Sequence, residues 1–191
     1  MKVALFSNQF VDNRGHGIAR YVNRLFETIL SGFSDIRLTP VSTWNNKDIA
    51  NFQKLRHEYG LFLLPWGRYL TPLSWSYLKG PRLEHWLGNT FELVHSPNLG
   101  YPLPTKKPYV VTVHDLGPLT KPQFFTKKNR RGMRLGFEHM LKNAQKIICV
   151  SQTTADEVQA VSRTSLVDRL QVIHEGVDLG LFEEPDPEGL Q

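Results

Sequence analysis

The sequence predicts one α/β domain with a doubly wound, mostly parallel sheet, and two observations carry this prediction. First, residues 3–41 hold an apolar run, a polar loop, a long amphipathic segment and a second apolar run. That order is a strand–helix–strand unit, from which doubly wound folds are built. Second, later apolar runs of similar length end in polar residues, as strands buried on both faces do. The 191 residues, of which 40% are hydrophobic, are enough for one sizeable core.

The elements of the first unit are the clearest. Val3–Phe6 predicts a buried strand, and the loop of residues 8–17 after it contains Gly15 and Gly17. Apolar residues then recur at three- and four-residue steps from Ile18 to Phe33, which predicts an amphipathic helix of about four turns. Residues 36–41 predict the second strand.

The remaining elements follow the same alternation. Residues 61–64 predict a strand that Pro65 ends, and helical spacing over residues 70–87 is interrupted near Gly80 and Pro81. Ser151 is a good N-cap for a short helix. Further strands are predicted at residues 91–95, 109–113, 147–150 and 170–173, and a helix at 133–144. The pattern as a whole favours a Rossmann-like domain.

The composition says more about the cellular compartment of the protein than about its binding partner. The formal net charge of +5 fits nucleic acid, an anionic membrane or a phosphorylated substrate equally well. A single cysteine, Cys149, favours a reducing compartment, and its apolar neighbours indicate a buried side chain and not a nucleophile. No secretory signal and no run of about 18–20 apolar residues is present, so we expect a soluble, cytoplasmic protein.

Candidate site residues follow the predicted strands, because open parallel sheets bind ligands outside the carboxyl ends of their strands. His114 comes directly after a buried strand, where it could donate a hydrogen bond or carry a proton in a cleft, or could only cap the strand end. The other candidates in the cleft are His95, Asp115, Ser151 and Glu175.

The loop Gly15–His16–Gly17 is a candidate phosphate site, because its backbone leads into the N-terminus of the predicted helix. A flexible turn explains the two glycines equally well. Arg20 fills the third glycine position of the nicotinamide fingerprint, which argues against that cofactor. The histidines are spaced too irregularly for a metal site, so no metal or other cofactor is expected.

The order of these motifs resembles the N-terminal domain of family-four retaining glycosyltransferases, which have the two-domain GT-B fold. Four segments carry the resemblance: residues 14–22, residues 94–97, residues 111–116, and residues 144–151 together with 173–178. Relatives usually have glycine where this chain has His16, and Pro-Asn where it has His174 and Glu175. The resemblance covers nearly the whole chain.

The resemblance implies a function. The chain would be the acceptor-side half of a retaining transferase, with residues 1–182 as the domain and 183–191 as the start of a linker. A C-terminal domain would bind the nucleotide-sugar donor, and this half alone would be inactive. Residues 15–17 would face the donor diphosphate, and His114 would approach the transferred sugar on its way to an unknown acceptor. Two pairs of glutamates, Glu84 with Glu92 and Glu175 with Glu183, match the spacing of the donor-binding signature but lack its loop-then-helix context.

Alternatives to catalysis remain open. The chain could be a non-catalytic module that binds carbohydrate, lipid or protein. The basic run of residues 127–134 could contact the inner face of a membrane peripherally, or could be an ordinary solvated helix face. Nucleic-acid binding is not expected, because no recognised motif accompanies the charge.

Overall fold

The computed structural model describes residues 1–11, 17–43, 49–100 and 102–177. Seven parallel strands form one sheet in the order β3-β2-β1-β4-β5-β6-β7. The strands are β1 (Lys2–Phe6), β2 (Arg37–Thr43), β3 (Phe62–Leu64), β4 (Leu93–Ser96), β5 (Tyr109–Val113), β6 (Lys146–Cys149) and β7 (Leu170–Val172). The predicted fold class is therefore confirmed.

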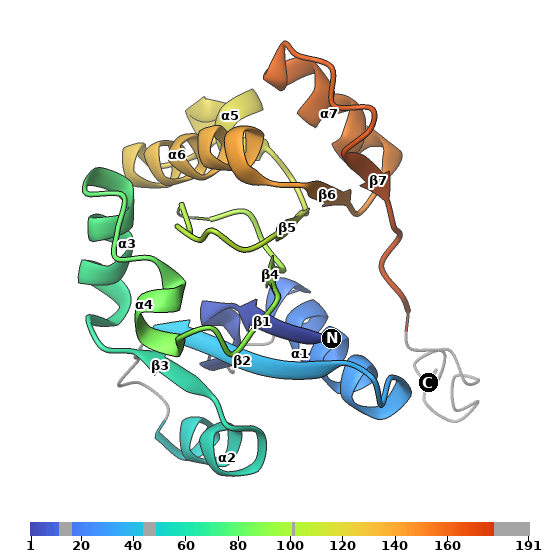
Figure 1. Cartoon of the computed structure of the whole chain (residues 1–191). Coiled ribbons are helices and arrows are strands. Elements are labelled where there is room, and N and C mark those ends of the chain that lie inside the picture. The colour runs from blue at the N-terminus through green and yellow to red at the C-terminus, as the bar shows by residue number, and fades with distance from the viewer. Residues whose placement is uncertain (12–16, 44–48, 101, 178–191) are drawn as a thin grey trace, which may run out of the picture.

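The chain winds outward from the middle of this sheet in two directions. From β1 it proceeds through β2 to β3 at one edge, then returns past β1 to β4 and continues to β7 at the other edge (Figure 1). The direction of winding changes between β1 and β4. In a doubly wound sheet the crevice at such a switch point, outside the carboxyl ends of the strands, is where ligands bind.

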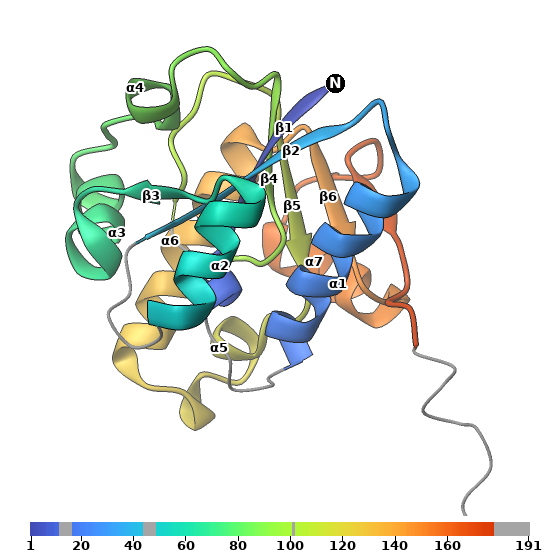
Figure 2. The ribbon, with the colours of Figure 1, turned by 90° about the horizontal axis from the view of Figure 1, so that it is seen from below.

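Helices cover both faces of the sheet. α1 (Gly17–Gly32) and α2 (Ile49–Tyr59) cover one face and lie nearest the viewer in Figure 2. The other face carries α3 (Gly67–Tyr77), α4 (Leu83–Leu87), α6 (Lys127–Asn143) and α7 (Gln152–Ser162) (Figure 1). The short helices η1 (Asn8–Val11), α5 (Gly117–Thr120) and η2 (Pro122–Phe124) lie in the connections.

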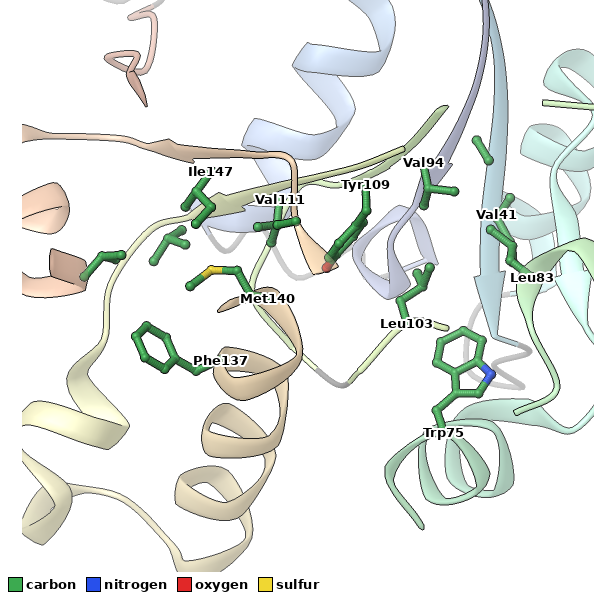
Figure 3. Close-up of a cluster of buried hydrophobic side chains, with 14 of the residues drawn as sticks. Val41, Trp75, Leu83, Val94, Leu103, Tyr109, Val111, Phe137, Met140 and Ile147 are labelled. Carbon is green, nitrogen blue, oxygen red and sulfur yellow. The ribbon is translucent and has the colours of Figure 1, made fainter. Parts of the chain in front are cut away.

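Each face has its own apolar core. In α1, Ala19, Val22 and Phe26 are buried at the three- and four-residue spacing seen in the sequence, and Val22 and Phe26 pack with Leu5 of β1. The larger core fills the opposite face, where side chains of β4, β5 and β6 meet those of α3, α4 and α6 (Figure 3). Packing against these two cores holds the strands in place, and so positions the residues that follow the strand ends.

The predicted elements are present, with ends shifted by a few residues. The α3 and α4 helices replace the single interrupted segment at 70–87, and the strand predicted at 91–95 begins only at Leu93. The α2 helix was not predicted. The predicted linker lies outside the described residues. In the described part of the chain, no helix has the length and apolarity needed to cross a membrane.

Candidate active site

His114 directly follows β5, and both of its ring nitrogens have partners. Its Nε2 lies 2.9 Å from the carbonyl oxygen of Pro97, in the loop after β4. Its Nδ1 lies 2.7 Å from Oε1 of Glu175, which follows β7. The side chain of His114 is only 12% exposed, whereas that of Glu175 is 42% exposed. Three sequence segments therefore meet at one imidazole ring.

The partners determine which atoms carry hydrogen. A backbone carbonyl can only accept, so Nε2 must donate to Pro97. A carboxylate also only accepts, so the contact with Glu175 is a hydrogen bond when Nδ1 carries a hydrogen as well. The Nδ1 of His114 is thus held by a carboxylate that is itself partly exposed.

Tyr21 of α1 forms one wall beside His114. The two rings meet edge to face, with centroids 4.8 Å apart. Burial raises the pKa of Tyr21, so its hydroxyl keeps its hydrogen at neutral pH. Gly17, the first residue of α1, lies four residues before Tyr21, about one helical turn or roughly 6 Å along the axis. The start of α1 therefore adjoins His114, whereas Gly15 and His16 lie outside the described residues.

His95 is on β4 and belongs to a separate, interior chain of polar groups. Its Nε2 lies 3.0 Å from Oγ1 of Thr112, which is 3.4 Å from the hydroxyl of Tyr21. Burial lowers the pKa of His95 to about 4, so the ring is neutral at neutral pH. His95 is therefore linked to Tyr21 through Thr112.

Ser151 and Asp115 have mainly structural contacts. Ser151 caps α7, because its Oγ accepts from the backbone N–H of Thr154 at 3.1 Å. Oγ1 of Thr154 in turn donates to the backbone carbonyl of His114 at 3.1 Å, which ties the start of α7 to the end of β5. Asp115 is exposed, and its Oδ1 accepts from the backbone N–H of Gly117 at 2.8 Å, which fixes the turn into α5.

The loop that holds Pro97 is itself fixed by α6. Gly136 of α6 lies so close to the loop that a Cβ there would be 1.7 Å from the carbonyl oxygen of Gly100. Real side chains do not approach a backbone oxygen so closely. Gly136 therefore permits the contact between α6 and the loop, and the loop presents the Pro97 carbonyl to His114.

His114, Glu175 and the Pro97 loop meet at the carboxyl edge of the sheet, beside Tyr21 of α1. A family model, glycosyltransferase family 4, matches residues 16–181, which is most of the chain. The chain belongs to glycosyltransferase family 4. It is thus a glycosyltransferase domain, and the predicted family resemblance is confirmed.

A solved structure supports the fold of this glycosyltransferase domain. The domain is similar to the crystal structure of Anabaena Alr3699/HepE in complex with UDP, with 17% sequence identity and a TM-score of 0.55. The alignment covers 97% of this chain and 47% of that one, so the domain spans about half the length of its structural neighbour. No curated protein sequence matches. The fold is that of one half of the two-domain GT-B architecture.

Three residues of the glycosyltransferase domain that could suggest chemistry, Glu84, Glu92 and Cys149, have structural roles instead. Glu84 accepts from the backbone N–H of Lys106 at 2.7 Å, and Glu92 accepts from that of Lys2 at 2.7 Å. These two glutamates hold loops at the amino ends of strands, far in the fold from His114. Cys149 is buried, and burial raises the pKa of its thiol to about 11, so it is no nucleophile. Within the described ranges no three acidic, histidine or cysteine side chains gather as metal ligands would.

Sequence reasoning missed the residues that act through backbone atoms or from another element. Tyr21 reads as one more apolar position of α1, and Thr112 as part of a buried strand. The Pro97 carbonyl gives no side-chain signal. Only the contacts across the sheet identify them as neighbours of the two histidines.

Proposed function

We propose that this domain is the acceptor-side half of a retaining glycosyltransferase that uses a nucleotide-sugar donor. The observation that carries the proposal is His114, a nearly buried imidazole at the carboxyl edge of a family 4 domain, whose Nδ1 is held by the carboxylate of Glu175, a side chain that is 42% exposed. The neighbour HepE was crystallised with UDP, which supports a nucleoside diphosphate as the leaving group here.

In the proposed reaction the bond between C1 of the sugar and the diphosphate oxygen breaks. The acceptor hydroxyl oxygen forms the new bond to C1, and its proton is taken up by the departing diphosphate. The donor is an activated substrate, so the reaction needs no redox cofactor and we propose no resident metal. Residues 15–17, with the start of α1, face the diphosphate, where backbone N–H groups favour an anion.

His114 acts at the sugar. Pro97 fixes the ring through Nε2, so Nδ1 is the nitrogen that remains to donate to a sugar oxygen. Glu175 holds that nitrogen until the donor arrives and then moves toward solvent, which its exposure permits. In the transition state positive charge develops on C1 and the ring oxygen, and negative charge develops on the departing diphosphate. Hydrogen bonds to sugar hydroxyls strengthen at that point, so the contact stabilises the transition state more than the bound donor.

A second domain supplies most of the donor site in this proposal. Isothermal calorimetry of residues 1–191 with UDP-, GDP- and ADP-sugars tests this division. We expect binding weaker than about 1 mM for all three, because few contacts remain without the base- and ribose-binding half. Micromolar affinity for any of them would place the donor site within this chain and contradict its proposed location in a second domain.

The stereochemistry of the product tests the reaction class separately. In the enzyme that this domain forms with its donor-binding domain, NMR of the first product would show the same anomeric configuration as the donor. An inverted product would refute retention, and no transfer with any donor and a panel of sugar and lipid acceptors would favour a non-catalytic binding module.

A further inference from the structure

The outer face of α3 is apolar where a solvent-facing helix is normally polar. The inner face of α3 is buried, through Thr71, Pro72, Ser74 and Trp75. Its outer stripe consists of exposed apolar or aromatic side chains at three- and four-residue steps: Trp66, Tyr69, Leu70, Leu73, Tyr77 and Leu78. Tyr69 and Leu70 are 68% and 60% exposed. Single exposed apolar residues are common, but a stripe along a whole helix indicates a contact surface.

A row of cations borders this stripe. On α6, Lys127, Lys128, Arg131 and Arg134 are all exposed and recur on one side of the helix. Two of them reach α3: Nζ of Lys128 lies 5.9 Å from the ring centroid of Tyr69, and the guanidinium of Arg131 lies 5.1 Å from that of Tyr77. The two helices are therefore neighbours, as Figure 1 also shows, and their exposed faces form one surface. We call it the α3–α6 surface.

Charge is strongly segregated onto this part of the molecule. Residues 60–83 and 116–137 contain nine of the 23 Lys and Arg residues and none of the 18 Asp and Glu residues. The rest of the chain has 14 basic and 18 acidic residues, so it is net acidic although the protein as a whole is basic. The positive potential is thus focused where the apolar stripe is exposed.

We infer that the α3–α6 surface docks the domain on an anionic lipid membrane. Tyrosine and tryptophan favour the membrane–water interface, leucines enter the acyl boundary, and lysine and arginine attract anionic headgroups. Here all three kinds of side chain lie on one exposed surface. This proposal is independent of the proposed reaction.

Other occupants fit the surface less well. A second copy of the chain would bring the same row of cations against itself, and Glu138 of α6 is the only acidic residue of α3 and α6 that could compensate it. Nucleic acid would use the cations but would leave the leucines in water. An anionic membrane satisfies both the charge and the apolar stripe.

Vesicle sedimentation tests the proposal with residues 1–191. We would compare vesicles of phosphatidylcholine with vesicles in which about a third of the lipid is phosphatidylglycerol, which gives a surface potential like that of an anionic leaflet. The domain should pellet with the anionic vesicles, and added salt should weaken the binding. If the wild-type domain stays in the supernatant with anionic vesicles at low salt, the proposal fails.

Paired variants separate the contributions of charge and apolar contact. Each cation near an anionic surface contributes about a fivefold gain in partitioning, so K128E with R131E should lower it by roughly 30-fold or more. L70S with L73S should lower partitioning about tenfold or more, because fewer apolar groups enter the boundary. Circular dichroism and thermal melts would confirm that each variant is folded.

Matched controls lie on the opposite face of the molecule. R37E with R56E gives the same change in net charge, and L30S with F33S removes apolar side chains that are also exposed at the end of α1. These variants should change binding less than about threefold, because their side chains do not face the membrane. Equal losses in controls and surface variants, or an unchanged L70S/L73S protein, would overturn the proposal. The proposal would also be overturned if the wild-type domain formed a dimer on size exclusion, the surface variants abolished that dimer, and no protein bound vesicles.

Discussion

At the scale of single residues, His95 and His114 have similar sequence contexts and different chemistry. Each lies at or after the end of an apolar strand. Burial makes His95 a neutral interior group that bonds to Thr112, whereas His114 has both nitrogens bonded to oxygen acceptors at the sheet edge. The sequence predicted both as cleft residues, but it could not distinguish them, because the difference comes from the neighbours that the fold supplies.

The buried ring of His95 predicts a pH dependence of stability. Its pKa is about 4 in the folded protein and about 6.5 in an unfolded chain, so between these values the unfolded state binds a proton that the folded state does not. Stability therefore falls as the pH drops from 6.5 to 4. The H95Q variant should lose this contribution, which is at most about 3 kcal/mol. Urea unfolding at several pH values would measure the free energy of unfolding of both proteins. If it falls equally with pH in the wild type and in H95Q, His95 is not the cause.

Glu175 tests the proposed displacement at Nδ1. In the two-domain enzyme, E175A should lower KM for the donor severalfold and leave kcat near wild type, because the sugar no longer competes with the carboxylate. E58Q on α2, whose glutamate is exposed, is the control. A large fall in kcat for E175A would instead mean that Glu175 positions or charges His114 during the reaction.

At the scale of elements, the sequence predicted most strands and helices but not how they meet. Apolar runs and the spacing of Ile18 to Phe33 located β1, α1 and their neighbours well. The α2 helix was missed although Ile49, Phe52, Leu55 and Tyr59 recur at three- and four-residue steps, because the segment is short and otherwise mostly polar. The contact between α6 and the Pro97 loop was also invisible, since a glycine in a helix gives no sign of what passes beside it.

That contact gives a prediction about Gly136. Alanine normally stabilises a helix interior relative to glycine by about 1 kcal/mol, but here its Cβ would overlap the Gly100 carbonyl. G136A should therefore destabilise the domain by roughly 2–3 kcal/mol, or lower Tm by about 5–10 °C. G32A, at the open end of α1, is the control and should be neutral or stabilising. If G136A melts at or above the wild-type temperature, α6 does not press on the loop as described.

At the scale of the whole molecule, the site exists because strands far apart in sequence end at one edge. His114 and Glu175 meet although they lie 61 positions apart in the sequence, because only β6 lies between β5 and β7 in the sheet. Alternating apolar runs predict a parallel sheet, but the strand order, and so the identity of each residue's neighbours, requires the folded chain. The family resemblance supplied roles for residues 15–17 and His114, and these roles stay predictions until they are measured.

The most direct test of the account is H114A in the enzyme formed by this domain and its donor-binding domain. If His114 contacts the sugar as the bond to phosphate breaks, the variant should lose about 30- to 1000-fold in kcat, corresponding to roughly 2–4 kcal/mol. Its affinity for the donor and its melting temperature should stay close to wild type. Turnover within a few-fold of wild type, together with a lower melting temperature, would show that His114 only ties the end of β5 to the Pro97 loop.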